Sequence, residues 1–172
     1  MPRAFKGRSG RLPADISFRP INDGDLEFLH QLYASTRADE LAQVDWDDEQ
    51  KTQFLTQQFN AQHSFYQEQF GQAEFLMIEA DGKPVGRVYV DQRADEIRLI
   101  DIALVPEQRN SGLGTALLKD LLDEAQAVGL PVKIHVEKFN PAMRLYRRLG
   151  FQALEDQGVY QLMEWRPVGK TQ

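Results

Sequence analysis

The chain contains no cysteine among its 172 residues. Disulfides, cysteine nucleophiles and cysteine–zinc sites are therefore excluded. Histidine is also scarce: His30, His63 and His135 follow no metal-binding spacing, so we expect no metal. Apolar runs long enough to cross a bilayer are missing, and we expect no secretory leader. These absences predict a cytoplasmic protein whose chemistry does not use thiols.

Basic residues are few outside the first 14 positions. The formal net charge is −6, but residues 1–14 carry four basic residues and no acid, which leaves 16 basic and 26 acidic residues in 15–172. This acidic body argues against a nucleic-acid partner, and we expect no membrane partner either. We expect a disordered basic tail at 1–14, one domain over 15–167 and a short C-terminal tail at 168–172.

Hydrophobic periodicity predicts an α/β (α+β) domain. The expected order is one strand, two helices, three strands, a helix, a strand, a helix and two strands. A right-handed parallel crossover around the helix at 112–128 then gives a mixed, mostly antiparallel sheet with helices on both faces. The expected strands are Ile16–Pro20, Phe75–Ala80, Val85–Asp91, Ile97–Val105, Val132–Glu137, Phe151–Leu154 and Val159–Trp165.

The helices are predicted from their capping residues and apolar spacing. Asn22 or Asp23 caps the first, and Ser35–Trp46 then forms a polar connection that can include a short helix. The second begins near Asp47, and the last runs from Asn140, with proline next to it, to Leu149. Aromatic and apolar residues of the second helix are expected to pack in the core or to line a substrate pocket: Phe54, Leu55, Phe59, Phe65, Tyr66 and Phe70.

A glycine-containing loop, RNSGLG, joins the apolar strand ending near Val105 to the helix at 112–128. Helix starts carry unsatisfied N–H groups and partial positive charge, so this pattern is typical of an anion site. Gly112 and Gly114 remove side chains where a phosphate must approach the backbone. Arg109 can add a charge-assisted contact. An ordinary strand-to-helix connection with a solvated arginine is the alternative.

The loop RNSGLG and the later segment NPAMRLYRRLGF together resemble the GNAT superfamily of N-acetyltransferases, over roughly residues 16–166. The resemblance implies a GNAT-like sheet with a splayed central parallel strand pair, and acetyl-CoA as co-substrate. It also implies cofactor contacts, through main-chain groups in the strand and the loop, at Ile102, Ala103, Leu104, Arg109, Asn110, Ser111, Gly112, Leu113, Gly114, Thr115, Asn140 and Tyr146. Asn140 serves equally well as a helix cap.

The resemblance places Tyr146 at the family's proton donor to the leaving sulfur, although a half-buried core tyrosine is the alternative. Asp101 lies in the predicted strand on the same side as Leu99, where a carboxylate is costly to bury alone. It is our candidate for a water-mediated base. The competing interpretation is a structural carboxylate, paired with Arg98 or capping a bulge.

We therefore expect an acetyl-CoA-dependent N-acetyltransferase that acts directly on a primary amine of a small molecule or peptide. A non-catalytic acyl-CoA-binding or regulatory domain and a protein-modifying acetyltransferase are the alternatives. A monomer and a homodimer are both compatible with the sequence. His135 and Glu137 are reserve candidates for the base, and the expected acceptor-site residues are Tyr33, Arg37, Glu40, Trp46, Phe59 and His63.

Overall fold

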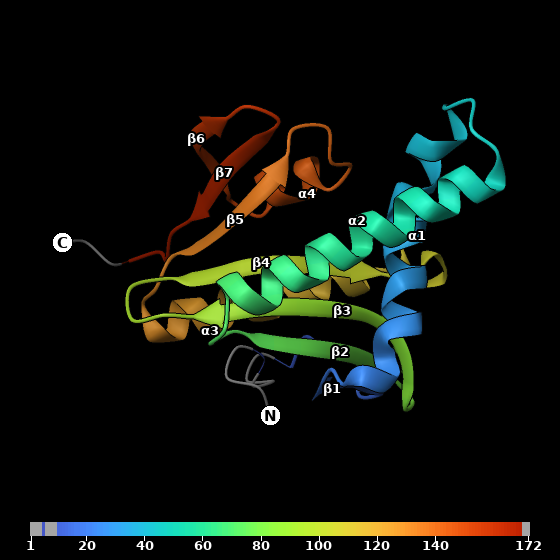
Figure 1. Cartoon of the computed structure of the whole chain (residues 1–172). Helices are drawn as coiled ribbons and strands as arrows, with labels where there is room; N and C mark the ends of the chain where they lie inside the picture. Colours follow the sequence, from blue (N-terminus) through green and yellow to red (C-terminus); the bar gives the residue numbers. More distant parts are fainter. Residues whose placement is uncertain (1–4, 6–9, 170–172) are drawn as a thin grey trace.

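A seven-stranded sheet organises the computed structural model, which describes residue 5 and residues 10–169 (Figure 1). The strand order is β1-β2-β3-β4-β5-β7-β6. Among these strands only β4 and β5 pair in parallel, which confirms the predicted mixed α/β fold class. The strands are β1 (Ile16–Pro20), β2 (Glu74–Ala80), β3 (Lys83–Gln92), β4 (Ile97–Leu104), β5 (Val132–Glu137), β6 (Gln152–Gln157) and β7 (Tyr160–Trp165).

The helices begin and end at residues suited to those positions. Asn22 caps the 3-10 turn that leads into α1, and Asp47 forms a capping box with Gln50 at the start of α2. Helix α3 lies between two left-handed glycines, Gly112 and Gly129, whose φ angles are 88° and 75°. The helices are α1 (Leu26–Ala42), α2 (Asp48–Gln69), α3 (Leu113–Val128) and α4 (Met143–Arg148), with 3-10 turns η1 (Asp23–Asp25) and η2 (Pro106–Gln108).

Two helix boundaries differ from the sequence-based expectation. Within the expected connection Ser35–Trp46, only residues 43–46 connect the helices, because α1 continues to Ala42 and buries Leu41. The last helix begins at Met143 rather than at Asn140, because the Asn140 side chain accepts a hydrogen bond from the amide of Ala142 and holds a turn. Local side-chain bonding therefore delays α4 by three residues.

Each face of the sheet has its own core. Helices α3 and α4 cover one face, where Val88, Leu99 and Leu117 belong to a large apolar cluster. Helices α1 and α2 cover β2 and β3 on the other face, where Leu29 and Phe59 pack on Met77 (Figure 1). The predicted core stripe of α2 is only partly correct, since Phe59 is its one fully buried member and Phe65 is 54% exposed.

The terminal predictions fall largely on residues 1–4, 6–9 and 170–172, which lie outside the described part of the chain. Phe5 is described: its ring stacks on Phe18 with centroids 4.9 Å apart, and it is buried in the α3-side core. In the described ranges, none of the helices combines the length and apolar character needed to cross a bilayer.

The parallel pair β4–β5 is short and then opens. Only three residue pairs are in register, from Ile97 with Val132 to Leu99 with Ile134. Beyond them β5 rises away from β4 together with β7 and β6 (Figure 1). The backbone of 100–104 in β4 therefore faces a gap in the middle of the sheet, and such groups need a partner. This is the splayed pair that the resemblance implied.

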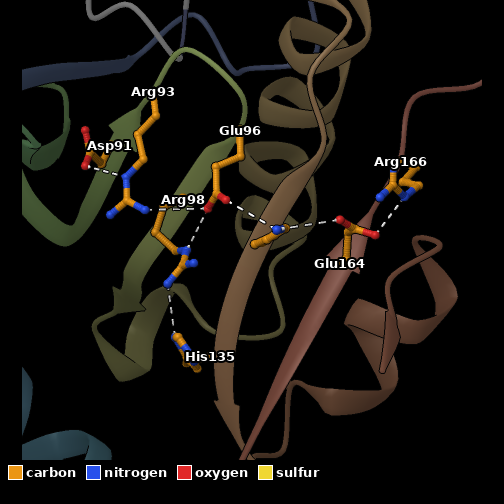
Figure 2. Close-up of polar contacts among 8 residues, drawn as sticks. Asp91, Arg93, Glu96, Arg98, His135, Glu164 and Arg166 are labelled. Atoms are coloured by element: carbon orange, nitrogen blue, oxygen red, sulfur yellow. Dashed lines mark hydrogen bonds and ion pairs between the residues drawn. The ribbon is translucent and has the colours of Figure 1, made fainter. Parts of the chain in front are cut away.

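A network of ion pairs holds the closed end of this opening. Figure 2 shows Glu96 next to Arg93 and Arg98, and Glu164 next to Arg166. Glu96, which is 8% exposed, lies 3.1 Å from Arg98 Nε, 3.7 Å from Arg93 Nη1 and 3.3 Å from Lys133 Nζ. Lys133 also approaches Glu164 at 4.0 Å. The network thus ties the β3–β4 hairpin to β5 and β7.

The network predicts that Glu96→Gln is strongly destabilising. Loss of this buried acid leaves Arg98 without its carboxylate, and Arg93 and Lys133 keep only Asp91 and Glu164, which costs on the order of 3 kcal/mol. The free energy of unfolding from urea titration measures this. Asp156→Asn is the control, because its ion pair with Lys138 is exposed and we expect little change. Equal effects of the two variants would show that the network does not stabilise the opening's closed end.

Candidate active site

A β-bulge in β4 decides where Asp101 points. Tyr89 pairs with Asp101 whereas Val90 pairs with Leu99, so Ile100 is the extra residue. The bulge reverses the alternation, and Asp101 therefore lies on the α1/α2 face while Leu99 stays on the α3 face. The expectation that the two residues share a side is wrong, because strict alternation fails at a bulge. The carboxylate thereby leaves the apolar core and reaches the opening between β4 and β5.

Asp101 is paired with Arg87 and not with Arg98. Arg87 Nε donates to Asp101 Oδ2 at 2.6 Å, whereas Arg98 Nε donates to Glu96. Arg87 also donates from Nη2 to Gln62 on α2 at 2.8 Å, and its guanidinium carbon lies 4.8 Å from the centroid of the Tyr89 ring. Burial alone would lower the pKa of Arg87, but the charge of Asp101 raises it above its ordinary value.

Tyr146 lies across the opening from the Asp101 face. It is a residue of α4, 3% exposed and part of the α3-side core, and its ring packs edge-on against Phe151 at 5.6 Å. Burial raises the pKa of the Tyr146 phenol, and the Asp101 carboxylate raises it further. The phenol therefore stays protonated at neutral pH.

The loop before α3 presents an open helix start. Gly112 is its N-cap and has no side chain to satisfy the helix amides, and the first turn carries no acid. Asn110 and Gly112 both have positive φ angles, 60° and 88°, which turn the backbone sharply into the helix. A methyl group added at Gly112 would meet no atom within 4 Å of the described chain. The Leu113 amide already donates to the Ser111 hydroxyl at 3.5 Å, so Gly114 and Thr115 are the residues that offer amides to an anion.

Two residues expected at the cofactor have protein partners. Arg109 donates from Nε to the Leu104 carbonyl at 2.9 Å and from Nη2 to Ser35 of α1 at 2.8 Å. Its side chain thus joins the loop to α1 and uses one carbonyl of β4. The Asn140 side chain accepts from the Ala142 amide and caps its own turn, which agrees with the alternative interpretation of Asn140 as a cap. Contacts of either residue with a cofactor stay predictions.

Most of the expected acceptor residues form one chain of contacts. Phe59 and His63 stack at 5.6 Å and, together with His30, line a cleft of about 560 Å³ between α1 and α2. The Tyr33 ring lies 6.2 Å from the Phe59 ring, and the Arg37 guanidinium carbon lies 5.5 Å from the Tyr33 centroid. Arg37 also donates to Glu137 of β5 at 3.1 Å and to Glu40 at 2.9 Å. Trp46 is separate: it lies in the α1–α2 connection and packs edge-on against Phe54 at 5.4 Å.

The structure brings together residues that sequence reasoning missed. Arg87 of β3 binds Asp101, Gln62 of α2 accepts from Arg87, and Tyr66 follows Gln62 by one turn of α2. Burial raises the pKa of Tyr66, with smaller effects from Asp101 and, at the start of β7, Tyr160. A signal for Arg87 exists in the sequence, since it is a lone cation in the otherwise apolar run of β3. Gln62 and Tyr66 carry no such signal, because polar and aromatic residues are common on both faces of α2.

His135, the other reserve candidate, lies on β5, and its Nδ1 is 3.3 Å from Arg98 Nη1 (Figure 2). Burial and the Arg98 charge lower its pKa. Among the described residues, no group of three or more histidine, aspartate or glutamate side chains is placed to hold a metal ion.

Comparisons with known proteins agree with this geometry. The chain is 38% identical over 82 residues to a mycothiol acetyltransferase of Thermobifida fusca, covering 46% of this chain and 22% of that protein. It is 33% identical over 94 residues to a putative ribosomal protein bS18-alanine N-acetyltransferase of Bacillus subtilis, covering 52% and 62%. The matches therefore span less than two thirds of these relatives.

Solved structures share the fold. The PaiA N-acetyltransferase of Thermoplasma acidophilum, determined in complex with coenzyme A, superposes with a TM-score of 0.65 at 20% identity over 88% of this chain and 98% of that one. The model of the acetyltransferase (GNAT) family matches residues 30–151, more than half of the sequence. The predicted resemblance is thus confirmed, and the chain belongs to the acetyltransferase (GNAT) family.

Proposed function

We propose that the chain is an acetyl-CoA-dependent N-acetyltransferase that moves an acetyl group directly to a primary amine, without a covalent enzyme intermediate. The arrangement that carries this proposal is the opening between β4 and β5, with the start of α3 at Gly112 and with Asp101 and Tyr146 on opposite faces of the sheet. Family membership supports the same class of enzyme and the same co-substrate.

Acetyl-CoA fits the groups that the site presents. The amides of residues 112–115 and the positive end of α3 suit its pyrophosphate. The backbone of Ile102, which has no strand partner on the β5 side, suits an amide-containing arm lying along β4. When bound there, acetyl-CoA supplies the thioester to be attacked. The relative solved with coenzyme A shares this fold, which supports the assignment.

Asp101 is our candidate for the base. A lysine-like amine with a pKa near 10.4 loses its proton at neutral pH at a cost of about 4–5 kcal/mol. The carboxylate Oδ2 is engaged by Arg87, so we assign Oδ1 to a bridging water that takes the proton. Aspartate is too short to reach the amine without such a water, and the water also lets the acceptor vary in size.

Tyr146 is our candidate for the acid. The departing thiolate needs a proton, and a phenol with a raised pKa holds one throughout the neutral range. Its burial between α4 and Phe151 fixes the ring. The residue therefore donates to the sulfur while the water beside Asp101 accepts from the amine.

The acceptor is a primary amine of a small molecule or a peptide. The names of the relatives include one protein alanine N-acetyltransferase and one acetyltransferase of the small molecule mycothiol. We therefore propose both classes as test acceptors: a peptide that begins with alanine, free lysine and a short diamine. CoA release that depends on one of them, with acetyl recovered on the amine by mass spectrometry, tests the proposal.

Tyr146→Phe is expected to lower kcat by about 10²-fold or more while leaving acetyl-CoA affinity nearly unchanged, because only the acid is lost. Stopped assays of CoA release and calorimetric titration of acetyl-CoA measure the two quantities. Unchanged kcat would remove this phenol from the mechanism. CoA release that ignores every amine would favour a non-catalytic acyl-CoA-binding domain.

Asp101→Asn is expected to reduce kcat/KM for the amine by about 10²-fold at neutral pH, because the amide accepts no proton. Asp91→Asn is the matched control: Asp91 is also a buried strand aspartate paired with an arginine, but it pairs with Arg93 in the distant ion network. Similar losses of kcat/KM in both variants would mean that Asp101→Asn lowers activity only by destabilising the fold.

Gly112→Ala is expected to weaken acetyl-CoA binding by about tenfold or more. Alanine strains the left-handed backbone at φ 88° by roughly 1–2 kcal/mol, and relaxation moves the anion-binding amides. Gly158→Ala imposes similar strain at φ 80° in the β6–β7 turn. If titration calorimetry gives the same dissociation constant for Gly112→Ala as for Gly158→Ala, the loop does not hold the pyrophosphate.

A further inference from the structure

We infer that Arg87 is a positioning residue for the transfer reaction: it fixes the direction of the Asp101 carboxylate and compensates its charge. This inference rests on the proposed function, in which Asp101 receives the proton of the amine. Arg87 belongs to β3, the strand next to β4, and its side chain is 4% exposed. It does not touch the opening where the acetyl group would lie.

The contacts of Arg87 lock its guanidinium from three sides. Nε donates to Asp101 Oδ2 at 2.6 Å, and Nη2 donates to Gln62 Oε1 at 2.8 Å. The guanidinium carbon also lies over the Tyr89 ring, 4.8 Å from its centroid. A planar group held by an acid, an amide and an aromatic face has little freedom to rotate. The carboxylate that it binds is therefore held at one angle.

Charge balance explains the pairing of Arg87 with Asp101. A buried guanidinium needs an anion, because an uncompensated charge in a low-dielectric site is costly. Among the described residues, Asp101 is the only carboxylate that forms a hydrogen bond or ion pair with Arg87. A nearby cation favours the charged form of a carboxyl group. Removal of Arg87 would therefore remove both the hydrogen bond that orients the carboxylate and the charge that compensates it.

Gln62 connects this arrangement to α2. It is the second partner of Arg87 and comes from the helix that covers β3 on the Asp101 face. Tyr66 follows one turn later, and its pKa responds to both Asp101 and Arg87. A shift of α2 therefore changes the support of Arg87, and through it the direction of the carboxylate. Gln62 thus supports Arg87, and Arg87 in turn supports the Asp101 carboxylate.

The pH dependence of catalysis tests the inference. Arg87→Met removes the cation but keeps much of the side-chain volume, and Arg87→Lys restores the charge without the planar donor. With acetyl-CoA and the amine that gives most CoA release among the three test acceptors, we expect the acid limb of kcat/KM in Arg87→Met to move about one to three pH units upward. The sign is upward because the carboxylate without its cation keeps a proton to higher pH. Arg87→Lys should restore most of the wild-type limb.

Arg93→Met is the matched control. Arg93 also pairs with an aspartate of its own hairpin and lies over an aromatic ring, that of Phe70 at 5.9 Å, but it has no contact with Asp101. We expect its pH profile to follow the wild type. Gln62→Met should shift the limb in the same direction as Arg87→Met but by less.

A second measurement needs no acceptor. In Arg87→Met the stranded carboxylate destabilises the fold more at pH 8 than at pH 5, where it takes up a proton. The double variant Arg87→Met/Asp101→Asn should lose this pH-dependent difference in the free energy of unfolding. If the rate profile of Arg87→Met matches the wild type and its stability loss does not depend on pH, the inference is wrong. Full activity of Asp101→Asn would instead overturn the proposed base, so the two failures are distinct.

Discussion

Everything at the candidate site depends on where the parallel pairing of β4 and β5 stops. Three residue pairs are in register, and beyond Leu99 and Ile134 each strand keeps a partner on its outer side only. The closed end is held by a network centred on Glu96 (Figure 2). Two strands that pair at one end only leave backbone donors and acceptors without partners inside the sheet. A ligand that contains amides can form hydrogen bonds with these groups.

The bulge at Ile100 turns this opening into a chemical site. It sends Asp101 to the face of α1 and α2, while Tyr146 stays in the core of the α3 face. We propose that the two groups act on the same opening from opposite sides of the sheet. Their environments differ: burial raises the pKa of the Tyr146 phenol, and the Asp101 carboxylate forms an ion pair with the buried cation Arg87.

The sequence predicts the order of elements, the mixed sheet and the glycine loop, because these depend on local periodicity and capping. It does not reveal the bulge, since one extra residue in Ile97–Leu104 leaves the apolar composition unchanged. The prediction that Asp101 lies on the same side as Leu99, and the alternative that it pairs with Arg98, were therefore wrong. The ends of α1 and α4 were misjudged for a similar reason: the burial of Leu41 and the side-chain bond of Asn140 are decided by folded neighbours.

A crystal structure of the full chain with bound acetyl-CoA, or with a stable thioether analogue, tests the central claim most directly. The account predicts the pyrophosphate on the amides of 112–115, the pantetheine arm between β4 and β5, and the sulfur within reach of the Tyr146 hydroxyl. A ligand bound outside the opening, or a β5 strand that closes onto β4 and leaves no room for the arm, would contradict it.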